Sequence, residues 1–302
     1  MANLREIRGR IKGVKNTSKI TQAMKMVAAA KLRRAQDAIL SARPYSNAMR
    51  GLIKHLLSKI DRTLLPLMNE REETNAVLIV VITADRGLCG AFNSNIIKIA
   101  TNRIHGEFAD LHAEGKVELL CIGRRGLQHF SKRGYPIADS FIGLSDSPEF
   151  LNIRSIAQEI TQAFLDGKYD RVEIVYNEFK SVVQQRQKAE PMLPIPSTEF
   201  DAAHDDLDDE PSHEYIDYIY EPSSIELLET LVPRHLNFQL WRCILESNAA
   251  EQGARMTAMD AATSNAKDLI QSLQLEYNQA RQASITTEIL EIVSGANALA
   301  ES

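Results

Sequence analysis

The two ends of the chain and its middle carry different patterns of hydrophobic and polar positions. Residues 14–50 contain no glycine and one proline, Pro44, while residues 234–294 contain one glycine, Gly253, and no proline. Both segments are rich in residues that favour helices. They predict two helices far longer than the ~11 residues of an average globular helix. The first would have about 55 residues, and the second would be roughly 90 Å long at ~1.5 Å per residue.

The C-terminal segment places apolar or small residues at alternating steps of three and four, which is the spacing of a left-handed coiled coil. These seam residues are Met256, Met259, Thr263, Ala266, Ile270, Leu273, Tyr277 and Ala280. The N-terminal segment repeats the same steps at Ile7, Ile11 and Val14 and again at Ala28, Leu32, Ala35 and Ile39. A compact domain lies between the two segments, so they are predicted to pair as a long antiparallel coiled coil.

The middle of the chain alternates short apolar strands with amphipathic helices. Residues 76–87 form a continuous apolar run that ends in a turn, as expected of a buried parallel strand. Further strands are predicted at 116–123, 170–179 and 181–189, and helices at 93–112, 124–134 and 149–167. This alternation indicates an open, Rossmann-like α/β sheet.

These patterns divide the chain into three parts. Residues 1–60 and 234–302 are predicted to be the coiled-coil helices, and residues 70–232 the central α/β domain. Residues 197–233 hold twelve Asp and Glu and no Lys or Arg. They are expected to form an acidic loop around a possible short strand at 215–221, and the pattern assigns no role to the acidic stretch 199–217.

The bulk composition is that of an ordinary folded protein. Of 302 residues, 44% are hydrophobic and 25% are charged. The longest apolar run, residues 76–82, is far shorter than the ~20 residues of a membrane-spanning helix. The basic N-terminus lacks the apolar core of a signal peptide, so a cytoplasmic location is expected. Cys89, Cys121 and Cys243 are widely separated, which predicts neither a disulfide framework nor a zinc site.

The net charge of −5 hides a strong asymmetry. Residues 1–60 hold 14 Lys and Arg against Glu6 and Asp37, whereas residues 61–239 hold 17 basic and 30 acidic residues. Cations concentrated in one helix predict an acidic partner: nucleic acid, an anionic lipid surface, or carboxylates on another protein. Nucleic acid is disfavoured because Tyr45 is the one aromatic residue in the first 60 positions, and stacking usually needs more. A coiled-coil scaffold with a solvated cationic face is the simplest alternative.

The sharpest local motif is "TADRGLCGAFN", residues 83–93, where a strand end meets a glycine-rich turn and a helix start. Such a turn can bind phosphate, but neither G-x-G-x-x-G nor G-x-x-x-x-G-K-[ST] is present. Cys89 has no motif that places a His beside it as a base. We therefore expect Gly87 and Gly90 to permit a tight turn and Arg86 to be an exposed contact residue, with no cofactor and no metal.

Three stretches together resemble the gamma subunit of F-type ATP synthase. They are "TSKITQAMKMVAAAKLRRAQ" (17–36), "TADRGLCGAFN" (83–93) and "ARMTAMDAATSNAKDLIQSLQLEYNQARQASITTEILEIVSGANAL" (254–299). The resemblance covers both ends and the centre in the family's order, but the acidic segment 199–217 has no match. It implies a non-catalytic rotor shaft that transmits torque between the c-ring and the catalytic beta subunits and so couples proton flow to ATP synthesis.

The resemblance also implies roles for particular residues. Contacts with the beta subunits are expected from Met24, Lys25, Lys31, Arg33, Arg34, Arg86, Arg281 and Gln282. An apolar bearing tip that turns with little friction is expected at Ile285, Ile289, Ile292 and Val293. Non-directional contact would keep the friction of such a tip low. The family's antiparallel geometry further suggests that the numbers of facing residues sum to about 279, with Met24 near Arg255.

The partners implied are three alpha and three beta subunits, the epsilon subunit and the c-ring. The location implied is the cytoplasmic face of a bacterial inner membrane, reached only through the c-ring, with no nucleic acid bound. A nucleic-acid-binding coiled-coil protein remains the alternative.

Overall fold

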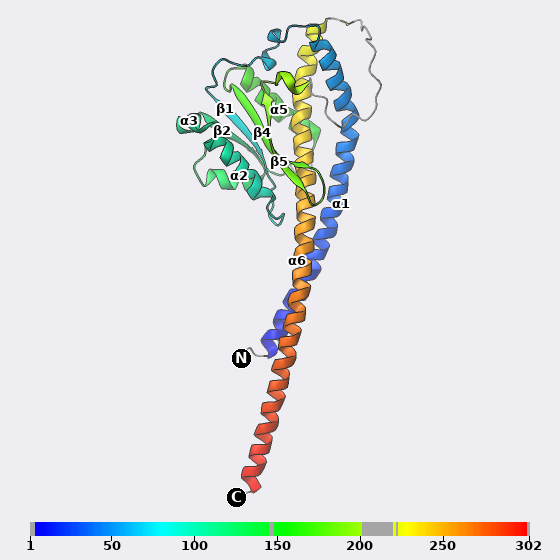
Figure 1. Ribbon diagram of the computed structural model, residues 1–302, viewed down its shortest axis with the longest axis vertical. Coiled ribbons are helices and arrows are strands. Elements are labelled where there is room, and N and C mark those ends of the chain that lie inside the picture. Colours follow the sequence, from blue (N-terminus) through cyan, green and yellow to red (C-terminus); the bar gives the residue numbers. More distant parts are fainter. Residues whose placement is uncertain (1–3, 145–147, 201–219, 222, 301–302) are drawn as a thin grey trace. The chain divides into compact units, whose positions relative to one another are not determined.

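The computed structural model describes residues 4–144, 148–200, 220–221 and 223–300 (Figure 1). The chain forms two compact units, one made of Met1–Ala29 with Arg255–Ser302 and the other of Ala30–Ala254. We call them the helical unit and the sheet unit. Two helices, α1 (Leu4–Leu57) and α6 (Ser224–Ala300), contribute residues to both units.

Helix α6 begins ten residues before the predicted start at Arg234. The Ser223 hydroxyl accepts a hydrogen bond from the Glu226 amide at 3.3 Å, so Ser223 caps the helix, and an acidic residue in the first turn favours its positive end. The last part of the predicted acidic loop, 224–233, is therefore helical, and the helix continues through Pro233. Residues 201–219, the larger part of that loop and most of the possible strand at 215–221, lie outside the described residues.

In the helical unit, α1 and α6 run antiparallel in one register. A buried hydroxyl pair joins Thr21 to Thr263 with oxygens 2.7 Å apart. Lys25 pairs with Asp260 at 2.6 Å, and Arg8 donates to the Tyr277 hydroxyl at 2.6 Å. The residue numbers of each facing pair add up to 284 or 285, so the predicted sum of about 279 was wrong. A sum of 279 would set Thr21 against Ala258, which is not a seam position.

The sheet unit contains a five-stranded sheet in the order β3-β2-β1-β4-β5. Strands β1 to β4 are parallel and β5 pairs antiparallel with β4. The strands are β1 Val77–Ile82, β2 Val117–Ile122, β3 Ile137–Phe141, β4 Arg171–Phe179 and β5 Gln185–Leu193. The helices are α2 Phe92–His105, α3 Ala109–Ala113, α4 Arg124–Ser131 and α5 Phe150–Leu165, with 3₁₀ turns at Arg62–Leu64, Pro66–Met68 and Ser197–Glu199. This is the predicted open α/β sheet.

Three details of the sheet differ from the prediction. Strand β3 was missed because its sequence, "IADSF", is polar and half exposed at the sheet edge. Strand β5 begins four residues later than the predicted 181–189. The predicted helix 93–112 is two helices, since α2 ends at His105 with Gly106 as its C-cap and α3 begins at Ala109.

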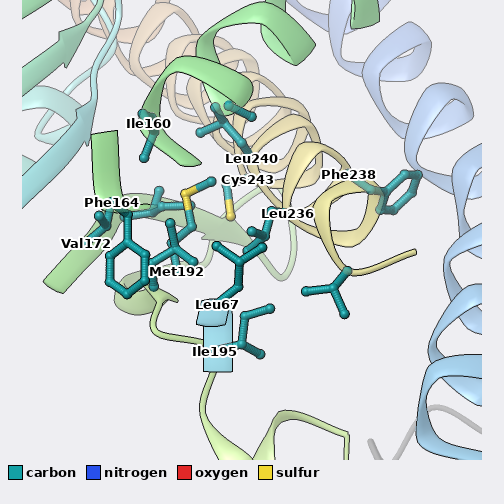
Figure 2. Packing of buried hydrophobic residues seen from close by; sticks show 14 of the residues in the cluster. Leu67, Ile160, Phe164, Val172, Met192, Ile195, Leu236, Phe238, Leu240 and Cys243 are labelled. Atoms are coloured by element: carbon teal, nitrogen blue, oxygen red, sulfur yellow. The ribbon is translucent and has the colours of Figure 1, made fainter. Parts of the chain in front are cut away.

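The two faces of the sheet are covered by different helices. In β1, Val77, Ile79 and Val81 pack with residues of α2 and α4. Leu78, Val80 and Ile82 pack on the other side with α1, α5 and α6. Every residue of β1 is buried, as a central strand covered on both faces requires. Figure 2 shows the second cluster, where Leu236, Leu240 and Cys243 of α6 lie beside Met192 of β5 and Phe164 of α5.

A buried charged network joins α6 to β5 in the same unit. The Glu190 carboxylate is contacted by Arg242, by Lys188 at 3.0 Å and by Gln239 at 2.8 Å, and it accepts from the Tyr176 hydroxyl at 3.0 Å. Burial alone would raise the pKa of Glu190, but the charges of Arg242 and Lys188 outweigh it and lower the pKa to about 2. The paired charge holds α6 against the sheet, since a buried carboxylate is stable only when it is compensated.

Candidate functional site

The sheet has its topological switch point between β1 and β4, where ligands bind in many open α/β folds. Here the carboxyl ends of these strands are covered by α6. Ala250 and Ala254 of α6 pack with Ala84, Cys89 and Phe92, and Phe179 at the end of β4 joins the cluster. A side chain at Gly253 would lie 3.4 Å from the Phe179 ring. The helix thus occupies the position at which a nucleotide would bind.

The loop that follows β1 is held rigidly by hydrogen bonds to its neighbours. The Asp85 carboxylate accepts from the backbone amides of Arg124 at 3.0 Å and Gly143 at 2.9 Å. The Thr83 hydroxyl accepts from the Gly126 amide at 2.9 Å. A side chain at Gly123 would lie 2.1 Å from the Thr83 carbonyl oxygen, so only glycine fits there. The three loops after β1, β2 and β3 are therefore fixed to one another.

This rigid loop presents two side chains to solvent. Arg86 is exposed, as expected from the motif. Leu88 is 65% exposed and has a φ of 64°, a left-handed conformation that costs a leucine about 1–2 kcal/mol. Gly90, with a φ of 57°, adopts the same conformation without that cost. Cys89 is buried between them, with its sulfur 3.2 Å from the Asn93 amide nitrogen.

Within the sheet unit, α1 has an apolar face and a cationic face. Leu32 and Ala35 are buried against Ala249 of α6. Arg33 and Arg34 are exposed, and Lys31 is half buried. Arg33 and Arg34 thus lie on the solvent-exposed side of α1, and Lys31 lies beside the buried face.

Within the helical unit, the predicted seam residues lie where α6 meets α1. Met259, Ala266 and Leu273 are buried, and Met256, Ile270 and Tyr277 are half buried. Among the predicted contact residues of α1, Met24 and Lys25 are half buried, and the Lys25 ammonium is engaged by Asp260.

The last turns of α6 carry the predicted tip. The described part of α1 begins at Leu4 and its Arg8 pairs with Tyr277, so α6 continues well past the end of this pairing. Arg281 and Gln282 are exposed. The four apolar tip residues are also exposed: Ile285 at 48%, Ile289 at 55%, Ile292 at 71% and Val293 at 50%.

Sequence reasoning missed several exposed apolar residues. On α1, Ile20, Met26 and Val27 are 59%, 62% and 58% exposed. Ile20 and Val27 are seven residues apart and so share one helix face, outside the seam, and this second stripe could have been found from the sequence. Leu88 could not, because nothing in its residue type indicates a positive φ.

The described residues show no group of three or more His, Cys, Asp or Glu placed to hold a metal ion. Burial raises the pKa of the Cys121 thiol to about 12, so that thiol is not a reactive nucleophile. In the part of the chain that the structure describes, none of the helices has the length and hydropathy of a bilayer-spanning segment.

Comparisons with known proteins agree over the whole chain. The protein family described as ATP synthase matches residues 3–299. The ATP synthase gamma chain of Chloroherpeton thalassium is 52% identical over 100% of both chains. That of Chlorobaculum tepidum is 50% identical over 99% of each. In fold, the chain is similar to a chain from the rotor of the Euglena gracilis mitochondrial ATP synthase, with a TM-score of 0.64, 21% identity, and coverage of 93% of this chain and 98% of that one. A chain from the OSCP/F1/c-ring structure of the same enzyme gives a TM-score of 0.66 at 20% identity, over 98% of this chain and 94% of that one.

Proposed function

Because the chain belongs to the ATP synthase gamma-chain family, we propose that exposed charges and apolar side chains of its long helices carry torque to the catalytic subunits. As a gamma chain it is the central-stalk rotor that links ion flow in the membrane part to ATP synthesis. The finer assignment concerns which parts act. Residues 1–60 and 234–302 supply the shaft, and residues 70–232, with the acidic segment 197–233, supply the domain that connects it to the rest of the rotor.

The cationic face of α1 is the observation that carries this proposal. Arg33 and Arg34 are exposed on a helix whose opposite face is buried, so their charges are free to attract carboxylates of a neighbouring subunit. Attraction between partly desolvated charges changes with angle and distance and requires no bond to form or break. A rotating cationic face would therefore couple the angle of the shaft to the conformation of three beta subunits in turn.

The proposed contact set on α1 also includes Met24, Lys25 and Lys31. The rigid loop adds Arg86, and α6 adds Arg281 and Gln282. Lys25 forms an ion pair with Asp260 of α6, so it links the two helices of the shaft as well as contacting a partner. The remaining members are exposed or half buried, which supports a role in intersubunit contacts.

The apolar end of α6 serves as a bearing. Ile285, Ile289, Ile292 and Val293 are exposed beyond the level at which the described part of α1 pairs with α6, so they are available to a surrounding apolar collar. Contacts between apolar groups are non-directional, which allows the tip to turn against its collar without breaking a sequence of hydrogen bonds.

The chain itself carries no catalytic role in this proposal. Its partners are three alpha and three beta subunits, the epsilon subunit and the ring of c subunits, with catalysis in beta. It is a peripheral subunit on the cytoplasmic side of the inner membrane, attached to the bilayer through the c-ring. The packing of α6 over the switch point supports a role for this part of the sheet other than nucleotide binding.

The test is charge reversal of the cationic face in the reconstituted complex. Arg33→Glu with Arg34→Glu should leave assembly intact and lower ATP-driven torque and ATP synthesis by roughly tenfold, as expected when close intersubunit charge pairs are lost. The matched control is Arg43→Glu, an exposed cation on the same helix outside the contact set. Equal synthesis rates in the double variant and the control would contradict the proposed contact.

A further inference from the structure

A basic groove lies between α2 and α4, on the face of the sheet opposite α5. The two helices pack on the same cluster of β1 and β2 side chains, whereas α5 packs on the other cluster (Figure 1). The groove has a volume of about 640 Å³. It is lined by Asn93, Ser94, Ile97, Lys98, Thr101 and Asn102 of α2, and by Arg125, Gln128, His129, Lys132 and Arg133 of and just beyond α4. Five of these residues are basic types and none is acidic.

The cations of this groove are left without acidic partners, unlike others in the same unit. Among the described residues, Lys98, Arg125 and Lys132 form no ion pair, and each is exposed. By contrast, Arg103 and Arg171 both bind Glu173, at 2.6 and 2.7 Å. The chain has more acidic than basic residues, with a net charge of −5. Several cations without an acidic partner in one groove therefore indicate a surface that binds an acidic partner.

His129 lies inside the groove beside a second basic side chain. The His129 ring nitrogen lies 3.1 Å from the Arg133 guanidinium. Partial burial, followed by the charge of Arg133, lowers the pKa of His129. Both causes disfavour a further positive charge at this position.

The shape of the groove fits a helix better than a small anion. Its basic residues follow the length of one wall, from Arg125 in the first turn of α4 to Lys132 and Arg133 just beyond its last residue, rather than converging on one point. Ile97 and Thr101, four residues apart, form a ridge on the other wall beside Lys98. Ridges of this spacing receive the side chains of another helix, and apolar stems of Lys and Arg line such a surface below their charges.

We propose that the groove between α2 and α4 docks an acidic amphipathic helix of a partner protein. Glu or Asp side chains four residues apart on that helix would meet Lys98 on one side and Arg125 and Lys132 on the other. One apolar residue between them would cover Ile97. None of these groove residues belongs to the proposed torque-transmitting contacts, so this is a second interaction surface of the rotor.

The test uses the full-length chain and a synthetic helical peptide with Glu at every fourth position and Leu on the inward side. Fluorescence anisotropy at low salt should show binding, and affinity should fall steeply as salt is raised, because exposed charges are screened. The Lys98→Glu/Lys132→Glu variant should bind roughly tenfold more weakly than the unaltered chain. A peptide with Gln in place of every Glu should bind as weakly as the Glu peptide binds to this variant.

The matched control is Arg154→Glu, an exposed cation of α5 on the other face of the sheet, which should bind the peptide like the unaltered chain. Circular dichroism establishes that the variants keep their fold. Equal affinity of the groove variant and the control, or equal binding of the Glu and Gln peptides, would overturn the proposal. So would displacement of the peptide by equimolar tripolyphosphate, which would assign the groove to a small anion. The Lys98→Glu/Lys132→Glu variant should retain rotation-coupled ATPase activity. The peptide-binding result is therefore independent of the proposed torque contacts.

Discussion

Single side chains decide the register in which α1 and α6 lie. The seam positions repeat every three or four residues, so several alignments of the two helices would bury apolar side chains. The Thr21–Thr263 hydroxyl pair, at 2.7 Å, and the Arg8–Tyr277 bond, at 2.6 Å, are satisfied in one alignment only. Buried polar groups select a register because leaving them unpaired is costly.

The hydroxyl pair gives a prediction at the residue scale. The Thr263 hydroxyl also lies 2.7 Å from the Met259 carbonyl and the Thr21 hydroxyl 3.1 Å from the Ser18 carbonyl, so each hydroxyl has a second acceptor on its own helix. Thr263→Val should lower the free energy of unfolding of the coiled coil by about 0.5–1 kcal/mol, the net worth of one hydrogen bond. The double variant Thr21→Val/Thr263→Val should cost less than the sum of the two single changes. A strictly additive double-mutant cycle in urea unfolding would show that the pair makes no contribution.

A buried histidine gives a second prediction. Burial, followed by the charges of Arg50 and Arg242, lowers the pKa of His235 from 6.5 to about 4. Its nearest acid, Glu199, lies 3.9 Å away, too far for a hydrogen bond. As the pH falls below 6.5, His235 becomes protonated in the unfolded chain but stays neutral in the folded chain. Stability is therefore lost between pH 6.5 and pH 4, by about 2 kcal/mol at pH 5.

His235→Phe removes this titration and places a ring beside Phe200, whose centroid is 5.0 Å from that of His235. Between pH 7 and pH 5, the free energy of unfolding of the variant should fall by about 2 kcal/mol less than that of the unaltered chain. Chemical denaturation at the two pH values measures the difference. An identical pH dependence in both proteins would mean that folding does not lower the pKa of His235.

At the scale of the element, the long helices follow from what their sequences lack and from the faces that they bury. Few glycines or prolines interrupt them, and the three-four spacing predicted which residues of α6 meet α1. The register was not predictable from that spacing, because it depends on hydroxyl and guanidinium contacts across the pair. Strand β3 was missed for a related reason: an edge strand such as "IADSF" buries little, so its sequence carries no hydrophobic pattern.

The seam gives a prediction at this scale. Ala266 is 7% exposed, so Ala266→Asp would place a carboxylate in the interface without a partner, at a cost of about 3 kcal/mol. Hydrogen exchange of residues 255–280 should become faster, and assembly with alpha and beta subunits should weaken. Ala261→Asp, at an exposed position of the same helix, should change neither property. Normal exchange and assembly in the Ala266 variant would contradict the seam.

At the scale of the whole molecule, a Rossmann-like sheet has lost its usual ligand position. Helix α6 covers the switch point with Ala250 and Ala254, and the buried Glu190–Arg242 pair fastens the same helix to β5. Helix α6 therefore packs at the position where ligands bind in many open α/β folds. Periodicity predicted the sheet, and the sequence of the loop after β1 lacks the motifs that bind phosphate. The sequence does not show that α6 fills the crevice, because this depends on contacts of Gly253 and its neighbours with residues distant in the sequence.

The central claim is that α1 and α6 work as one antiparallel shaft, and the most direct measurement is rotation with the two helices covalently joined. Thr21→Cys with Thr263→Cys should form a disulfide on oxidation, since the native oxygens are 2.7 Å apart. Thr21→Cys with Ala258→Cys, the pairing of the rejected register, should not. In the assembled complex, ATP-driven rotation should continue at an unchanged rate after the first bridge has formed. Failure of that bridge to form, or arrest of rotation in fully bridged complexes, would show that the helices do not turn as a unit.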